Sequence, residues 1–246
     1  MNTAREYLEI QRICRQNGLS IGSDQINQMA SYVEMLVDWN KKINLVSRRD
    51  EGNIWYSHVL HSISPWFFLE PPHQAKMIDL GTGGGLPGIP LAIVRPDVHL
   101  VLLDSIRKKT AAVEDMVKRL GLRDVQVMTG RAEDLVKKGR PSRSFDIVLA
   151  RAVAPLVDLV QWSLPLLQRE GGRAGYAGIA AARPGNRILL GMPCLVALKG
   201  GDLDTEILRA RQRVPASTVE TLDLVFEGSE SLGLVDKKVL VVTERR

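Results

Sequence analysis

The segment Met77–Pro90, MIDLGTGGGLPGIP, constrains the fold more than any other part of this chain. Its first residues predict a short buried strand, and four of the five residues 81–85 are glycine. Glycines gather in this way where the backbone turns sharply and a ligand comes close to it. The next residues open a predicted helix. A strand, a glycine turn and a helix N-terminus together form the nucleotide-binding corner of a doubly wound α/β fold.

Composition narrows the class of protein only a little. A length of 246 residues suits one α/β domain with an appendage, and it also fits two small domains. Hydrophobic residues make up 45% of the chain and charged residues 25%, which predicts a soluble protein with a sizeable core. The net charge of +5 permits an RNA partner without requiring one.

The sequence contains no predicted signal for a membrane or an oxidising compartment. No apolar run is long enough to cross a membrane, and Glu6 and Glu9 interrupt the N-terminus, where a signal peptide would be apolar. Cys14 and Cys194 lack the spacing of a metal or redox pair. We therefore expect a cytoplasmic monomer with no bound metal and no membrane partner.

The first seventy residues are predicted to be helical. One helix runs from an N-cap at Ser23 toward Trp39, with apolar residues at helical spacing. A second is predicted between about Asn53 and Ile63. Its predicted cap is Asp50 and its predicted end lies near Pro65.

The segment Glu70–His73 contains two consecutive prolines and is the predicted joint between two parts of the chain. Residues 1–70 then form a helical extension, and residues 71–246 form the α/β body. Within that body residues 174–193 follow no period, and we expect an inserted loop with a short helix there.

From Lys76 onward, strand-like and helix-like runs alternate as a parallel sheet requires. The final two strand-like runs have no crossover helix between them, which predicts an antiparallel hairpin at the sheet edge. The predicted strands are Met77–Leu80, His99–Asp104, Val125–Thr129, Phe145–Ala150, Leu195–Lys199, Val219–Phe226 and Val239–Glu244, and the clearest helices are Arg107–Leu120 and Pro155–Leu167.

The glycine turn admits two cofactor classes. Gly83, Gly85 and Gly88 have the dinucleotide spacing G-x-G-x-x-G, which by itself is a weak motif. Gly81, Gly83 and Gly85 have the spacing G-x-G-x-G after an acid at Asp79, the usual form in enzymes that use S-adenosylmethionine. A turn that serves only close strand–helix packing is the structural alternative to both.

Two further acids follow predicted strands. Asp104 ends the second strand, where a carboxylate accepts hydrogen bonds from both ribose hydroxyls of a nucleotide cofactor. It is equally placed to cap the helix that follows. After the third strand, Arg131-Ala132-Glu133 lies where residues flank an adenine ring, and Glu133 also suits the first turn of a helix.

If the chain is a methyltransferase, the residues after the fourth strand restrict the group that is methylated. Ala150-Arg151-Ala152 replaces the Asn/Asp-Pro-Pro-aromatic turn that is typical of exocyclic amine methylation. Cys194 leads into an apolar run, which favours a buried cysteine over a nucleophile for pyrimidine carbon. A ring nitrogen such as guanine N7 carries no proton that must leave, and its methylation requires no general base.

These residues resemble those of one family over nearly the whole chain. The shared positions are Trp39-Asn40-Lys41, Asn44-Leu45, Arg48, His58, Asp79 to Pro90, Leu102-Leu103-Asp104-Ser105, Arg131-Ala132-Glu133, Arg151-Ala152 and Ala197-Leu198-Lys199-Gly200. The chain is thus similar to the RsmG family (glucose-inhibited division protein B), bacterial 16S rRNA (guanine-N7) methyltransferases.

The resemblance implies a class I methyltransferase fold, Rossmann-like, with S-adenosylmethionine as cofactor and a guanine in the decoding region of 16S rRNA as substrate. It implies that Gly81, Leu86, Ala132, Glu133 and Arg151 contact the cofactor. With the residues from the motif analysis, the expected cofactor site is Asp79, Gly81, Gly83, Gly85, Leu86, Asp104, Ala132, Glu133 and Arg151. Arg131, Arg151 and Lys199 are the expected residues that hold RNA phosphate or orient the base.

The chain departs from the family in two places. His61 stands where the family commonly has an acid, three residues after His58. Residues 174–193 make the link into Leu198-Lys199-Gly200 about twenty residues longer than usual. Two other functions stay open at this point: an NAD(P)-dependent oxidoreductase, and a non-catalytic ribosome-assembly module with a vestigial cofactor pocket.

Overall fold

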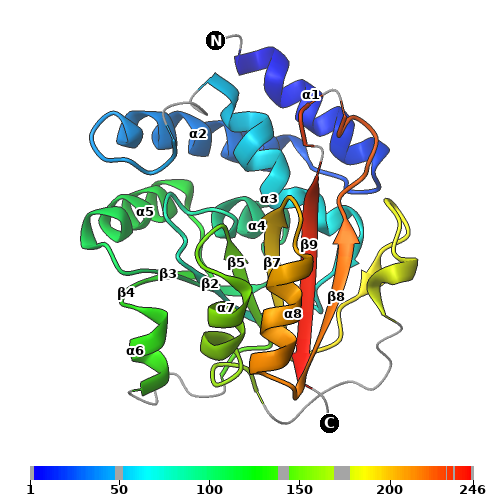
Figure 1. The fold of residues 1–246 in the computed structure, drawn as a ribbon. Coiled ribbons are helices and arrows are strands. Elements are labelled where there is room, and N and C mark those ends of the chain that lie inside the picture. The colour runs from blue at the N-terminus through cyan, green and yellow to red at the C-terminus, as the bar shows by residue number, and fades with distance from the viewer. Residues whose placement is uncertain are drawn as a thin grey trace.

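A seven-stranded sheet forms the centre of the protein, in the strand order β4-β3-β2-β5-β7-β9-β8 (Figure 1). The computed structural model describes residues 3–47, 52–137, 144–168, 178–230, 232–234 and 236–244. The strands of this sheet are β2 (Lys76–Leu80), β3 (His99–Asp104), β4 (Val125–Thr129), β5 (Ile147–Arg151), β7 (Cys194–Gly200), β8 (Ser217–Asp223) and β9 (Lys237–Glu244).

The first five strands of the central sheet are parallel, and β9 runs antiparallel to both β7 and β8. The predicted edge hairpin is therefore confirmed. Five of the seven predicted strands have other bounds: β2 begins at Lys76, β7 extends from Cys194 to Gly200, β9 begins at Lys237, and β5 and β8 differ at both ends. β5 begins at Ile147 rather than Phe145, because Phe145 forms only an isolated bridge with Leu167 while Ile147 pairs with Cys194. β8 ends at Asp223, the last residue that pairs with β9.

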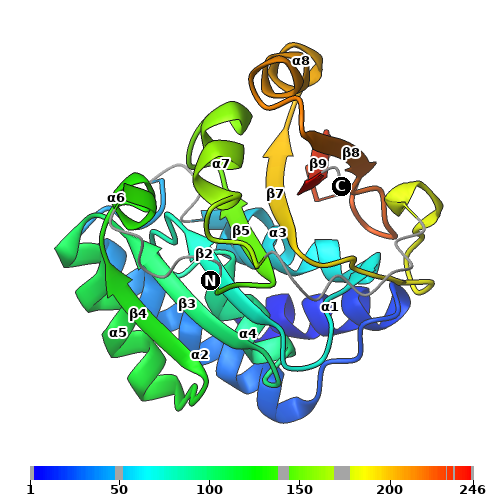
Figure 2. The same cartoon turned by 90° about the horizontal axis from the view of Figure 1, so that it is seen from below.

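Helices cover both faces of the sheet (Figure 2). One face packs against α1 (Thr3–Gln16), α2 (Ser23–Asn40), α4 (Gly88–Val94) and α5 (Arg107–Leu120), and the other against α6 (Ala132–Lys137), α7 (Leu156–Ser163) and α8 (Asp204–Arg213). Alternate residues of each strand enter the two cores, so Met77 belongs to one and Ile78 to the other. The helix predicted over Pro155–Leu167 is shorter in the structure, where α7 spans Leu156–Ser163.

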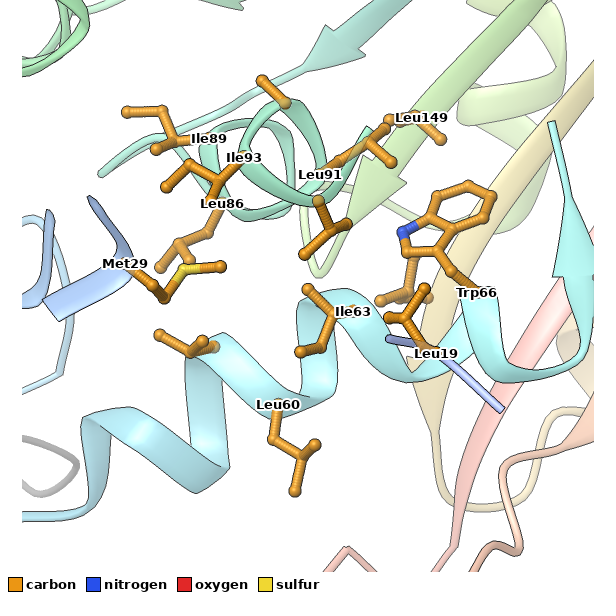
Figure 3. Close-up of a cluster of buried hydrophobic side chains, with 14 of the residues drawn as sticks. Leu19, Met29, Leu60, Ile63, Trp66, Leu86, Ile89, Leu91, Ile93 and Leu149 are labelled. Atoms are coloured by element: carbon orange, nitrogen blue, oxygen red, sulfur yellow. The ribbon is translucent and has the colours of Figure 1, made fainter. Parts of the chain in front are cut away.

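The N-terminal helices share a continuous core with the α/β body. Ile63 and Trp66 face the apolar side chains of the α4 region, among them Leu86 and Ile93, whereas Leu60 points to the other side of its helix and is buried in the same core (Figure 3). The chain between α2 and the sheet forms a π-helix (Trp55–Leu60), α3 (His61–Ile63) and the 3-10 helix Ser64–Phe67.

One predicted helix end in this extension was wrong, and a second is confirmed. Gly22, not Ser23, is the N-cap of α2, and its backbone N–H donates to Gln25 Oε1 at 3.0 Å. The second predicted end is confirmed, because α3 ends at Ile63. Pro65 then lies in the first turn of the separate 3-10 helix Ser64–Phe67, where its missing N–H is not needed. Asp50 lies outside the described residues.

The predicted joint pairs with the predicted insertion. β1 (Leu69–Glu70) runs parallel to β6 (Ile188–Leu189) in a separate two-stranded sheet. The described part of the insertion, residues 178–193, also contains a short 3-10 helix, Ile179–Ala181. No helix in the described parts of the chain is both long and apolar enough to span a bilayer.

Candidate functional site

A cavity of about 440 Å³ opens at the carboxyl ends of β2, β3, β4 and β5. From β2 the chain first builds the sheet outward through β3 to β4, and it then returns to β5 on the other side of β2. The point between β2 and β5 is therefore the topological switch point, where α/β folds bind ligands. The cavity is lined by Leu80, Gly81, Gly83, Leu103, Asp104, Ser105, Ile106, Lys109, Gly130, Arg131, Ala132, Glu133, Arg151, Ala152, Val153 and Trp162.

The glycine turn forms one wall of the cavity. Gly81 has a φ of +69°, and a Cβ on it would come within 2.6 Å of Val153 Cγ1. The Thr82 backbone N–H donates to Leu103 O at 2.9 Å, and the Gly83 N–H donates to Asp104 Oδ2 at 3.0 Å. The turn after β2 is therefore fixed to the end of β3.

Asp104 is buried at the centre of this wall and accepts one backbone hydrogen bond on each oxygen. Oδ2 accepts from Gly83, and Oδ1 accepts from the Ile106 N–H at 2.9 Å, just before α5 begins. An ionised carboxylate has about four acceptor positions. The capping role is present, and acceptor positions are left for two ligand hydroxyls.

Asp79 supports the turn from inside the protein. Its side chain is fully buried, and Oδ2 accepts from Thr82 Oγ1 at 2.7 Å and from the Gly88 N–H at 3.1 Å. Among the described residues no hydrogen-bond partner reaches Oδ1. Burial is the main cause that raises the pKa of Asp79 to about 7, against an opposing effect of the two hydrogen bonds.

The wall that follows β4 carries charges of both signs. Arg131 Nη1 lies 3.6 Å from Glu133 Oε1, and the Arg131 side chain is largely exposed. Ala132 is buried at the start of α6, beside Gly130. These residues face the cavity together with Lys109 of α5.

Arg151 ends β5 on the opposite side of the cavity. Its Nη2 lies 3.0 Å from His58 Nδ1, and its Nη1 donates weakly to Ser57 O at 3.5 Å. The next residue, Ala152, has a φ of +51°, an uncommon conformation for a residue with a Cβ. Functional sites often contain such strained residues.

The segment after Arg151 is held by a group that we call the Lys199–Glu206 clamp. Lys199 Nζ donates to Ala154 O at 2.9 Å and to Glu206 Oε1. The same Glu206 oxygen accepts from the Leu156 N–H, the first of α7. Lys199 lies on β7 and is largely buried, and Glu206 lies on α8.

The structure gathers seven of the predicted residues around one cavity: Gly81, Gly83, Asp104, Arg131, Ala132, Glu133 and Arg151. Four others are not among its lining residues: Asp79, Gly85, Leu86 and Lys199. The sequence analysis missed the contacts of Glu206 and Trp162. Glu206 follows Lys199 by seven residues, but only the turn from β7 into α8 brings the two together.

Among the residues that the structure describes, the remaining reactive side chains do not form a second centre. Cys194 is fully buried, and burial raises the pKa of its thiol to about 12, which confirms a structural cysteine. Burial, with a smaller effect of nearby Arg151, lowers the pKa of His61 to about 3. Within the described ranges, no three His, Cys, Asp or Glu side chains are grouped as metal ligands.

Comparison with known proteins gives consistent results. A family model described as GidB, rRNA small subunit methyltransferase G, matches residues 25–183. The chain is 38% identical over 202 residues to ribosomal RNA small subunit methyltransferase G of Chlorobium phaeobacteroides, covering 82% of this chain and 79% of the relative. The protein of the same name from Clostridium novyi is 33% identical to this chain, and the match covers 87% of this chain and 79% of the relative.

Solved structures support the fold. The O-methyltransferase TomG from Streptomyces achromogenes, solved in complex with S-adenosylmethionine, superposes with a TM-score of 0.52 at 17% identity. The superposition covers all of both chains. The fold is therefore that of class I methyltransferases, with an α/β body and N-terminal helices, as the sequence predicted.

The raised pKa of Asp79 predicts a measurable pH dependence of stability. A carboxyl group whose pKa rises on folding makes its full contribution to the free energy of unfolding at pH values below its pKa in the unfolded chain. That contribution is lost as the pH rises through its pKa in the folded protein. Relative to Asp79→Asn, wild type should therefore lose stability between about pH 4 and about pH 7, by at most about 1.4 kcal/mol per pH unit. Urea unfolding of both proteins across this range measures the difference. Parallel stability curves would contradict the prediction.

Proposed function

The chain belongs to the GidB family, rRNA small subunit methyltransferase G, and from this premise we propose that it transfers a methyl group from S-adenosylmethionine to N7 of a guanine in the decoding region of 16S rRNA. The observation that carries the proposal is the cavity at the switch point, with Asp104 fixed beside the glycine turn. Family membership adds the substrate class, because the relatives bear the name of a small-subunit rRNA methyltransferase.

The residues present fit this cofactor in linear order along the sheet edge. Ala132 and Glu133 follow β4, Asp104 ends β3, Gly81 follows β2 and Arg151 ends β5. Neighbouring strands lie about 4.8 Å apart, so the edge from β4 to β5 spans about 14 Å. That order suits an adenine at Ala132, a ribose at Asp104 and an amino acid moiety between Gly81 and Arg151.

Each of these residues has a distinct task in the proposal. Asp104 accepts from the ribose hydroxyls with the lone pairs that Gly83 and Ile106 leave open. Arg151 pairs with the carboxylate of the amino acid moiety, since guanidinium and carboxylate match in charge and shape. Asp79, Gly85 and Leu86 do not line the cavity, and their proposed task is to fix the shape of the glycine turn that contacts the cofactor. Ala132 and Glu133 bound the adenine.

The cavity also suits an unassisted nucleophile. When bound, S-adenosylmethionine supplies a methyl group on a sulfonium centre, which an electron pair attacks in line. The N7 lone pair of guanine has no proton to lose, so the chain need not supply a base. Of the two carboxylates that line the cavity, Asp104 is engaged by backbone donors and Glu133 lies beside Arg131. Orientation alone contributes about 7–11 kcal/mol to lowering such barriers.

The proposed partner is 16S rRNA, with the small ribosomal subunit as the assembly that presents it. Lys109, Arg131 and Arg151 place three cations around the cavity, and the sequence carries a net charge of +5. We propose that the protein acts in the cytoplasm, because ribosomal RNA is its substrate, and without metal, because methyl transfer to N7 calls for no metal ligand set. We further propose that it acts as a monomer.

Methyl transfer itself tests the function. Purified protein with methyl-labelled S-adenosylmethionine should label 16S rRNA, and mapping of modified bases should place the label on one guanine N7. A thermal shift with NAD but none with S-adenosylhomocysteine would instead support the oxidoreductase alternative. Cofactor binding without transfer to RNA or to small subunits would support the assembly module.

Loss of the Asp104 charge should weaken cofactor binding. Asp104→Asn puts an amide N–H opposite a backbone donor and removes a charged acceptor, so we expect ten- to hundredfold weaker binding of S-adenosylhomocysteine, about 1.4–2.7 kcal/mol. Isothermal titration calorimetry measures the affinity. Asp158→Asn, on α7 outside the lining residues, is the matched control. Equal affinities of the Asp104 variant and wild type would remove Asp104 from the proposed site.

Lys199 should affect RNA-dependent turnover more than cofactor affinity. Lys199→Ala removes the clamp, so we expect at least about tenfold lower kcat/KM for RNA with nearly unchanged S-adenosylhomocysteine binding. Glu206→Gln weakens the clamp but keeps the lysine charge. If Lys199 holds RNA phosphate directly, this second variant should retain turnover. If Lys199 acts by fixing Ala154, both variants should lose it. A primary loss of cofactor affinity in Lys199→Ala would contradict both forms.

A further inference from the structure

His58 connects the N-terminal extension to the cavity. It lies in the π-helix Trp55–Leu60 and contacts Arg151, a lining residue 93 positions later in the sequence. A guanidinium group only donates hydrogen bonds, so His58 Nδ1 is the acceptor and the imidazole proton lies on Nε2. The contact therefore defines both the tautomer of the histidine and the direction of the arginine.

The π-helix itself is firmly held. Trp55, Val59 and Leu60 are buried in the core that includes α4. Ser62 Oγ donates to His58 O at 2.6 Å. π-helical turns are rare and occur often at functional sites, because the extra residue per turn redirects a side chain. Here the redirected chain offers Ser57 O and His58 Nδ1 to the same guanidinium.

Arg151 needs such support because its side chain is long. An arginine loses much rotamer freedom when it is fixed in one geometry. A hydrogen bond that already fixes the side chain in the empty protein reduces the loss at the moment of binding. The side chain is then ready for a bidentate contact with a carboxylate.

We propose that His58 is a positioning residue that aims Arg151 at the carboxylate of the cofactor's amino acid moiety. The N-terminal extension thereby forms part of the cofactor site. The inference rests on the proposed function and goes beyond it, because it assigns a role to a residue that does not line the cavity.

Two polar variants test the proposal without emptying the site. Asn places an amide oxygen near the position of His58 Nδ1, whereas the amide of Gln reaches further, toward the position of Nε2. S-adenosylhomocysteine carries the carboxylate, and 5′-methylthioadenosine lacks it. Calorimetry with both ligands separates the recognition of the carboxylate from the recognition of the nucleoside.

His58→Gln should bind S-adenosylhomocysteine about tenfold more weakly and 5′-methylthioadenosine as wild type does. His58→Asn should recover most of the lost affinity. Tyr56→Phe is the control in the same π-helix, because it removes a hydrogen bond to Glu9 instead. It should bind both ligands normally.

Three outcomes would overturn the role of His58: equal losses for both ligands, no loss for either, or an Asn variant as weak as the Gln variant. A loss confined to the KM for RNA would also overturn it, because Arg151 would then serve the substrate. Failure of wild type to bind S-adenosylhomocysteine at all would instead refute the proposed function.

Discussion

Two carboxylates hold the backbone turn after β2, and the cavity depends on them. Asp79 accepts from Thr82 and Gly88 beneath the turn, and Asp104 accepts from Gly83 beside it. The backbone N–H groups of this turn are thereby held in fixed directions, which a flexible loop would not do. Asp79 is buried with one oxygen lacking a partner among the described residues, which raises its pKa, whereas Asp104 lies at the cavity wall. The same residue type thus supports structure in one place and presents acceptor oxygens at the cavity wall in the other.

The N-terminal helices are part of this arrangement. Tyr32 of α2 donates from its hydroxyl to Gly84 O at 2.9 Å, and Asn40 at the end of α2 accepts from the backbone of Leu45 and Val46. The loop that Asn40 shapes contacts the glycine turn, since a Cβ on Gly84 would come within 3.3 Å of Leu45 Cβ. With His58 on Arg151, the extension therefore contacts the turn and the end of β5 alike.

The sequence predicted much of the body of the fold well. β3, β4 and α5 were predicted to the residue; α5 ends where Gly121 adopts a left-handed φ of +65°. α8 was missed because Ala210 is its only buried residue among ten, so its sequence shows no clear apolar face. In the site, spacing alone revealed the glycine turn and Asp104. The contact of His58 with Arg151 depends on how a π-helix packs against a sheet, and no local pattern indicates that.

Positioning has to supply most of the rate if no acid–base pair takes part, and the segment after β5 is built accordingly. His58 holds Arg151 from the face of the sheet covered by the N-terminal helices. The Lys199–Glu206 clamp holds Ala154 and the start of α7 on the side of α8. Between these two supports lies Ala152, with its positive φ. A strained backbone persists only where its surroundings determine it from both sides. The strain at Ala152 is thus a consequence of the two supports, and the residue that follows it, Val153, lies against Gly81 at the cavity wall.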